Sequence, residues 1–148
     1  MPQLAYNKKA KFDYQILESF EAGLLLEGHE VKSIRAGRMS LLGAYVTISR
    51  GAAWLIGSHV QKYPQAGPLL DYDTDRSRKL LLHRREIQKL AGKLEQKGLT
   101  LVPISVYTKG SKIKLEFGLA RGKKQFQKKE TLKRRDIDRE VRRVLRGK

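Results

Sequence analysis

The chain has 148 residues, enough for one domain with a hydrophobic core and a short extension. It carries 32 Lys and Arg against 15 Asp and Glu, a formal net charge of +17, and it has no cysteine. The lack of cysteine excludes disulfides, thiolate metal sites and a cysteine nucleophile, and makes the cytoplasm the expected location.

The excess of positive charge predicts a polyanionic partner. Nucleic acid is the commonest such partner, and an anionic membrane surface is the main rival. No apolar run approaches the roughly 20 residues that a membrane-spanning helix requires. We therefore expect a nucleic-acid partner and no membrane partner.

Five strands and two helices are predicted within residues 1–120, in this order: strand 14–26, helix 30–38, strands 45–49 and 52–56, helix 84–97, and strands 99–107 and 112–119. Gly23 predicts a bend or bulge in the first strand. Arg50-Gly51 predicts a hairpin turn between two short strands. Helix 84–97 has apolar residues at helical spacing and is followed by Gly98 as a stop.

The last two strands show the clearest pattern. Lys109-Gly110-Ser111 provides turn residues between them and predicts a second hairpin. Pro103 cannot donate a ladder hydrogen bond, so an edge or a bulge is expected there. The whole pattern predicts a mainly β protein with short helices, organised as an OB-like antiparallel β-barrel, a type known for binding oligonucleotides.

The C-terminal segment, residues 121–148, is predicted to be a separate basic tail. It carries 13 basic and 4 acidic residues and few large apolar ones, so it is expected to be disordered when free. Four apolar residues nevertheless share one face of a potential helix: Ile137, Val141, Val144 and Leu145. Arginines surround this stripe. Such a helix is also typical of membrane-surface or calmodulin-binding segments, but the narrow stripe favours folding on RNA.

Metal and catalytic signatures are weak. Asp71, Asp73 and Asp75 resemble the start of a calcium loop, but Arg76 and Leu82 stand where such a loop needs Gly and Glu. The three histidines are too scattered for metal-ligand spacing. We therefore expect no metal, no cofactor, no catalytic residue and no enzymatic activity.

Two basic segments near the N-terminus are candidate RNA contacts. Asn7, Lys8 and Lys9 combine an amide with ammonium groups, which suits phosphates and an unpaired base, although a solvated strand would have the same composition. Glu30 precedes Lys32 and Arg35. Its carboxylate could accept hydrogen bonds from base amino groups or orient a neighbouring arginine, but the spacing alone slightly favours a structural ion pair.

A third segment places three consecutive leucines between basic clusters. Lys79 precedes them within the run, and His83 follows them. Some of the leucines must belong to the core, whereas a leucine and a histidine at an exposed edge could pack against unstacked bases. The sequence leaves open which leucine does so.

Six stretches, in order along nearly the whole chain, resemble the SmpB family of proteins that bind transfer-messenger RNA. They are NKKA (7–10), FEAG (20–23), GHEVKSIRAG (28–37), RSRKLLLH (76–83), GLTLVP (98–103) and GLARGKK (118–124). The resemblance implies an OB-like barrel that holds the tRNA-like domain of transfer-messenger RNA. It also implies delivery of that RNA to stalled ribosomes in trans-translation, without catalysis by the protein.

The resemblance also implies functional residues. The expected RNA-binding set, which includes neighbouring basic side chains, is Asn7, Lys8, Lys9, Glu30, Lys32, Arg35, Lys79, Leu82, His83, Lys114, Ala120, Gly122, Lys123 and Lys124. The expected ribosome-binding set in the tail is Phe126, Gln127, Lys128, Lys129, Ile137, Val141, Val144 and Leu145. By resemblance the tail becomes helical in the mRNA channel, with residues 126–129 near the decoding centre. The family often has Asp where Gln127 stands, so a role that needs that negative charge is lost.

The resulting prediction is a monomer with two parts and two partners. Residues 1–120 form the RNA-binding barrel and residues 121–148 form the tail. The partners are transfer-messenger RNA and the ribosome. The alternative is a structural RNA-binding protein embedded in the ribosome, which would also be small, basic and tailed.

Overall fold

The computed structural model describes residues 3–64, 67 and 72–123. The predictions for the tail from Lys124 onward, and for Asp71, lie outside these described residues. Among the described residues, none of the helices is long and apolar enough to span a membrane.

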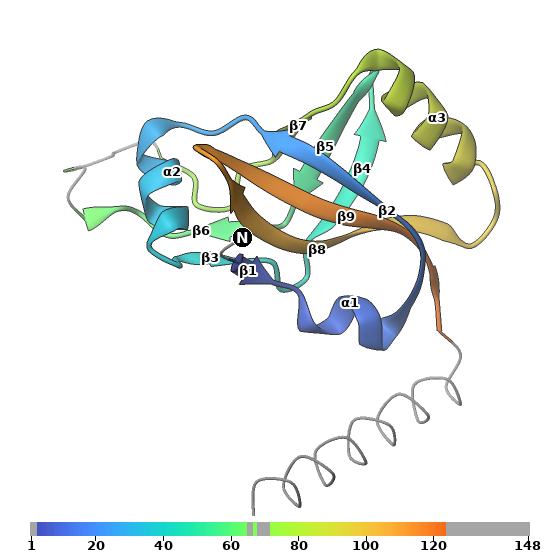
Figure 1. Ribbon diagram of the computed structural model, residues 1–148, viewed down its shortest axis with the longest axis horizontal. Coiled ribbons are helices and arrows are strands. Elements are labelled where there is room, and N and C mark those ends of the chain that lie inside the picture. Colours follow the sequence, from blue (N-terminus) through green and yellow to red (C-terminus); the bar gives the residue numbers. More distant parts are fainter. Residues whose placement is uncertain (1–2, 65–66, 68–71, 124–148) are drawn as a thin grey trace, which may run out of the picture.

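The main sheet is antiparallel and has seven strands in the order β1-β8-β4-β5-β7-β2-β9 (Figure 1). A further pairing between β8 and β9 closes it into a barrel, and β3 pairs with β6 in a small second sheet. The strands are β1 (Gln3–Tyr6), β2 (Tyr14–Leu24), β3 (Met39–Ser40), β4 (Tyr45–Ser49), β5 (Ala52–Ile56), β6 (His59–Val60), β7 (Arg78–Leu81), β8 (Leu99–Lys109) and β9 (Lys112–Gly122). The predicted OB-like, mainly β fold is confirmed.

The long β8–β9 hairpin is the most extensively paired part of the barrel. Its inward residues alternate as predicted, and Phe117, with no exposed surface, stacks on Phe20 of β2 at 5.6 Å between ring centroids. The predicted bulge is present, because the β8–β9 register shifts between Pro103 and Ser105. The register shift in β2 lies between Ile16 and Glu18 and not at Gly23, where the sequence predicted a bend or a bulge; at Gly23 the strand pairs with both β9 and β7.

The β4–β5 hairpin is confirmed at the predicted residues. Its turn places both Arg50 (φ 54°) and Gly51 (φ 73°) in the left-handed region, as a two-residue turn between twisted strands requires. The barrel closes on its other side with much less pairing, because Val46 of β4 and Leu101 of β8 are the single registered pair between these two strands.

Three helices cover the ends of the barrel: α1 (Lys8–Asp13), α2 (Gly28–Arg35) and α3 (Arg84–Leu94). The two predicted helices are present, although both end about three residues earlier than expected. Helix α1 was not predicted, because its six residues expose three lysines and bury only Ala10, which leaves no apolar period to detect.

Candidate RNA-binding surface

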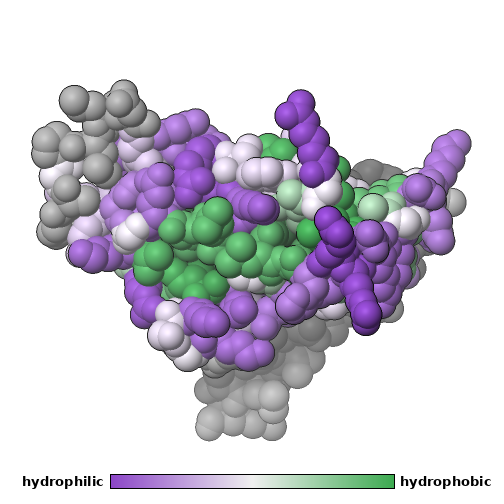
Figure 2. Space-filling view, turned by 90° about the horizontal axis from the view of Figure 1, so that it is seen from above, coloured by the Kyte–Doolittle hydropathy of each residue, from purple (hydrophilic) through white to green (hydrophobic). Residues whose placement is uncertain are grey.

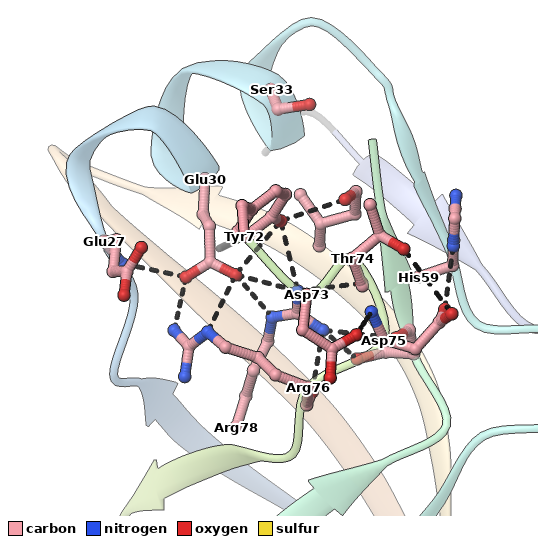
Figure 3. Close-up of polar contacts among 12 residues, drawn as sticks. Glu27, Glu30, Ser33, His59, Tyr72, Asp73, Thr74, Asp75, Arg76 and Arg78 are labelled. Carbon is pink, nitrogen blue, oxygen red and sulfur yellow. Dashed lines mark hydrogen bonds and ion pairs between the residues drawn. The ribbon is translucent and has the colours of Figure 1, made fainter. Parts of the chain in front are cut away.

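A buried ion-pair network joins α2 to the segment before β7 (Figure 3). The carboxylate of Glu30 has no exposed surface. Its Oε2 accepts a hydrogen bond from Nε of Arg78 at 2.9 Å, its Oε1 accepts one from the backbone N–H of Glu27 at 2.9 Å, and Arg76 pairs with both oxygens. The Tyr72 hydroxyl donates to Oε2 at 3.3 Å. One carboxylate therefore caps α2 and holds two arginines.

The protonation of Glu30 follows from these contacts. Burial raises the pKa of this carboxyl, but the hydrogen bonds from Arg76, the Glu27 N–H and Arg78 together outweigh burial and hold the pKa below its ordinary 4.5. Glu30 is therefore ionised at neutral pH. The structure favours the ion-pair interpretation of Glu30 and corrects the expectation that its side chain lies on the RNA-binding surface.

Arg78 extends the network into the barrel. It has no exposed surface either, and its guanidinium donates to the backbone oxygen of Ser58 at 3.2 Å, to the Ser58 hydroxyl at 3.0 Å and to the carbonyl of Thr74 at 3.1 Å. These contacts fix the start of β7. Along this strand Arg78 and Leu80 point inward, so Lys79 and Leu81 point outward.

The order of the three leucines is now defined. Leu80 is 1% exposed and belongs to the core, Leu81 is 53% exposed, and Leu82 is half-buried against the core. Sequence analysis did not select Leu81, because three leucines in a row give no alternation from which to read the face. The buried Arg78 at the start of β7 determines which of the leucines points inward.

Leu81 stands between two hollows in the surface. One, of about 410 Å³, lies between α2 and the tip of the β8–β9 hairpin and is lined by Gly23, Leu24, Leu26, Val31, Leu81, Ser111, Lys112, Ile113 and Lys114. We call it the α2 groove. The other, of about 430 Å³, lies beside α3 and is lined by Gly51, Lys79, Leu80, Leu81, Leu82, His83, Arg84 and Ile87. Both hollows together form the Leu81 surface. Figure 2 shows an apolar patch bordered by hydrophilic side chains on the face seen from above.

The floor of the α2 groove depends on Gly23. Leu81 packs directly over this glycine, since a Cβ there would lie 3.3 Å from Leu81 Cδ1. Leu25, which follows β2, is 54% exposed and adds to the apolar residues of this end. Two large exposed leucines this close together are unusual on a protein with so much charge, and they indicate an interaction site.

Basic residues border the apolar centre. Arg35 is exposed on α2, Lys79 is exposed on β7, and Lys112 and Lys114 line the groove from β9. The Arg35 guanidinium donates to the carbonyl of Ser111 at 2.8 Å and ties α2 to the hairpin tip. An apolar centre with a cationic border suits unstacked bases and their phosphates.

A carboxylate is also held in place on the outside of the barrel. Glu21 is exposed on β2, two residues before Gly23, and accepts hydrogen bonds from the Tyr107 hydroxyl and from Lys109 at 3.2 Å. The Tyr107 hydrogen bond is the largest cause that lowers the pKa of Glu21, so the group is anionic. A fixed anion near an RNA surface can accept only from donors such as base amino groups. Sequence analysis did not select Glu21, which lies in the FEAG stretch.

The predicted RNA-binding residues fall into two separate groups. Lys79, Leu82, His83 and Lys114 line the Leu81 surface, and Arg35 reaches its edge at Ser111. Lys32 lies outside these linings, with its ammonium 6.0 Å from the ring centroid of Tyr63. Asn7, Lys8, Lys9, Gly122 and Lys123 lie at the opposite ends of β2 and β9, around α1. Ala120 is fully buried, which corrects the expectation that its side chain contacts RNA.

The aspartate run forms a polar loop in the residues that are described. Asp73 Oδ1 accepts the backbone N–H of Asp75 at 2.9 Å, and Asp75 pairs with His59 Nδ1 at 2.8 Å. Within residues 3–64, 67 and 72–123, no three His, Cys, Asp or Glu side chains are arranged to hold a metal ion.

The chain is similar to known proteins over nearly its whole length. The model of a family described as SmpB protein matches residues 4–147. An SsrA-binding protein of Gloeothece citriformis is 53% identical over 139 residues, 94% of this chain and 90% of the relative. One of Oleidesulfovibrio alaskensis is 51% identical over 142 residues, 96% of this chain and 91% of the relative. A solved structure described as "tmRNA-SmpB: a journey to the center of the bacterial ribosome" is 42% identical, with a TM-score of 0.66, and the match covers 86% of this chain and 92% of the solved one.

Proposed function

The chain belongs to the SmpB family, and on this basis we propose that it binds the tRNA-like domain of transfer-messenger RNA and delivers this RNA to stalled ribosomes in trans-translation. The single observation that carries the binding step is the Leu81 surface, an exposed apolar centre bordered by cations on a protein of net charge +17.

The Leu81 surface suits a folded RNA with an unpaired loop. Proteins read such loops by packing splayed bases on apolar or aromatic groups, while basic side chains hold the phosphates. Leu81 and Leu25 provide the apolar contact for a base. Lys79, Lys112 and Lys114 lie around them, where they can contact the phosphates next to that base. The Glu30 network keeps β7 in register, so we assign Glu30 an indirect, positioning role in RNA binding.

We propose a second role for the basic tail, on the ribosome. The tail, residues 121–148, enters the vacant mRNA channel, with residues 126–129 near the decoding centre and the stripe from Ile137 to Leu145 on one face of a helix. Its charge of +9 supports this, because phosphates would neutralise the repulsion between its arginines. The protein acts as a monomeric, non-enzymatic adaptor in the cytoplasm, where ribosomes work.

The test is a salt-titrated binding measurement with the tRNA-like domain and an ordinary tRNA. We expect preference for the tRNA-like domain to persist near physiological salt, and Leu81→Ala to weaken that binding about tenfold, as loss of one base contact does. Equal binding of both RNAs that vanishes with salt would indicate a general polyanion binder. Co-sedimentation with ribosomes that lack transfer-messenger RNA would then favour a ribosome-embedded structural protein.

A further inference from the structure

We infer that Asn7 and Lys123 are positioning residues, which hold the two ends of α1 on the barrel and thereby fix the direction in which the tail leaves it. This inference rests on the function proposed for the tail, because a tail that enters the mRNA channel needs a defined origin relative to the Leu81 surface. The family resemblance implied both residues as RNA contacts. Their side-chain donors are instead directed at backbone carbonyls of the protein.

Helix α1 has few apolar contacts that could hold it in place. It is six residues long, and Ala10, which is 1% exposed, is its one buried residue. The lysines Lys8, Lys9 and Lys11 are exposed. A helix this short is not stable by itself in water. Its position on the barrel therefore depends on the polar contacts at its two ends.

The N-terminal end of α1 is fixed to the bulge in β8. Asn7 precedes the helix and is 8% exposed. An asparagine in this position usually accepts a hydrogen bond from its own helix, but the Asn7 side chain makes no such bond. Its amide donates to the carbonyl of Pro103 at 2.9 Å, and its backbone N–H donates to the carbonyl of Ile104 at 2.8 Å. Both carbonyls lie at the β8–β9 register shift, where a bulge disrupts the ladder.

The C-terminal end of α1 is fixed by Lys123. Strands β2 and β9 remain paired up to this point, and the Lys123 backbone N–H donates to the carbonyl of Asp13 at 2.8 Å. The Lys123 ammonium donates to the carbonyl of Lys11 at 2.7 Å. An ammonium group in this place satisfies a carbonyl at the end of the helix and complements the helix dipole. Residues 124–148 therefore continue from a fixed point.

Loss of either contact should affect the tail and leave the Leu81 surface unchanged. Without the Asn7 amide or the Lys123 ammonium, one end of α1 is released, and the tail would leave the barrel in a wider range of directions. The Leu81 surface lies at the far ends of β2 and β9 and shares no residue with these contacts. The expected loss is therefore in peptide tagging and not in binding of the tRNA-like domain.

Amide hydrogen exchange of the full-length protein measures the fixation directly. Lys123→Ala keeps the backbone N–H of residue 123, and we expect this N–H to exchange about tenfold faster, as for loss of one hydrogen bond made by a charged group. Asn7→Ala should accelerate the same N–H. Lys9→Ala removes a charge from α1 without touching either contact, so its exchange should match the parent. Unchanged exchange in Lys123→Ala would refute the fixation, also where Asn7→Ala is too unstable to measure.

Peptide tagging on stalled ribosomes tests the consequence for function. Lys123→Ala should tag several-fold less than the parent but bind the tRNA-like domain with the same affinity and salt dependence. Lys123→Arg should tag as the parent does, since a guanidinium also donates to a carbonyl. A salt dependence lowered by about one ion in Lys123→Ala would overturn the inference, because Lys123 would then contact a phosphate of that RNA.

A reversible cross-link separates positioning from a direct contact of the ammonium with the ribosome. The chain has no cysteine, and Asp13 and Lys123 are hydrogen-bonded neighbours, so Asp13→Cys combined with Lys123→Cys allows one disulfide between α1 and the end of β9. We expect the oxidised form to tag like the parent and the reduced form to tag like Lys123→Ala, although neither form has the ammonium.

Equal tagging by the oxidised and reduced forms would overturn the positioning role. If both forms were active, fixation would be unnecessary, and if both were inactive, the ammonium itself would be required. Failure of the parent to tag would count against the proposed function instead. The exchange measurement needs no RNA and would still test the fixation of α1.

Discussion

Glu30 supports the proposed RNA-binding surface without being part of it. Its carboxylate joins the first turn of α2 to Arg76 and Arg78, and through Arg78 it fixes the register of β7. Leu81 is presented three residues later on the outer face. Loss of one partner from a buried ion pair leaves the other charges uncompensated, which costs about 3–5 kcal/mol.

We expect Glu30→Gln to lower the free energy of unfolding at neutral pH by about 3 kcal/mol, because a neutral amide leaves two arginines without their counter-charge. The pKa of Glu30 is lowered from 4.5, so its ionisation stabilises the parent above that pH, and this contribution is lost as pH falls through the folded-state pKa. The difference between parent and variant should therefore narrow in acid. Urea unfolding at a series of pH values measures this, and a pH-independent difference would contradict it.

Leu80 and Leu81 form a matched pair of neighbouring residues with opposite environments. Leu80→Ala should lower the free energy of unfolding by about 2–5 kcal/mol, since it empties a core position. Leu81→Ala should lower it by less than about 1 kcal/mol and should act on RNA affinity instead. Thermal unfolding and RNA binding of both variants provide the check, and a larger loss of stability from Leu81→Ala would show that the leucine is structural.

At the scale of elements, the barrel depends on one close approach between strands. A Cβ on Gly118 of β9 would lie 2.8 Å from Ile16 Cγ2 on β2 and 3.3 Å from Ile104 Cδ1 on β8. We expect Gly118→Ala to destabilise the protein by about 1–3 kcal/mol, because three strands must separate slightly. Gly122→Ala is the matched control on the same strand, with nothing within 4 Å of its Cβ. Denaturant unfolding of the two variants compares them directly.

The elements that could be predicted from the sequence are those with their own local pattern. Both hairpins have turn residues between their strands, and α3 has four apolar residues at helical spacing. Strand β7 and helix α1 have neither. Strand β7 has four residues, one of them a buried arginine whose partners lie 20 and 48 positions earlier in the chain, and no local pattern encodes such contacts.

The residues of the candidate site could be predicted from the sequence, but their positions relative to one another could not. The basic residues and the leucine run were identified from the sequence, but their division between two ends of the barrel was not. That division arises because β2 and β9 are 11-residue strands that run from one end of the barrel to the other, so residues near their two ends lie far apart. Only strand pairing determines which ends lie together.

For the whole molecule, charge is divided between the barrel and the tail. Ending the chain after Lys123 removes eleven basic and four acidic residues and lowers the net charge from +17 to +10. We expect the shortened protein to bind the tRNA-like domain within a few-fold of the parent near physiological salt, with a shallower salt dependence, because fewer counterions are released. It should fail to support peptide tagging on stalled ribosomes.

Binding and tagging assays on the same shortened protein separate the two roles. Normal tagging without residues 124–148 would remove the tail from the mechanism, whereas loss of RNA binding would place the main RNA contact in the tail instead of on the Leu81 surface.

The barrel is joined very unevenly around its circumference. Strands β8 and β9 are paired along ten positions, but β4 and β8 share only the Val46–Leu101 pair. This seam is the place where local opening should have the lowest free energy, so its amides should exchange with solvent before those of the β8–β9 hairpin. Leu101 and Ala44 at the seam also line a surface groove of about 370 Å³ beside α1. A ligand held in that groove would contact both sides of the seam and slow its opening. The barrel would then open less often when the ligand is bound than when it is free.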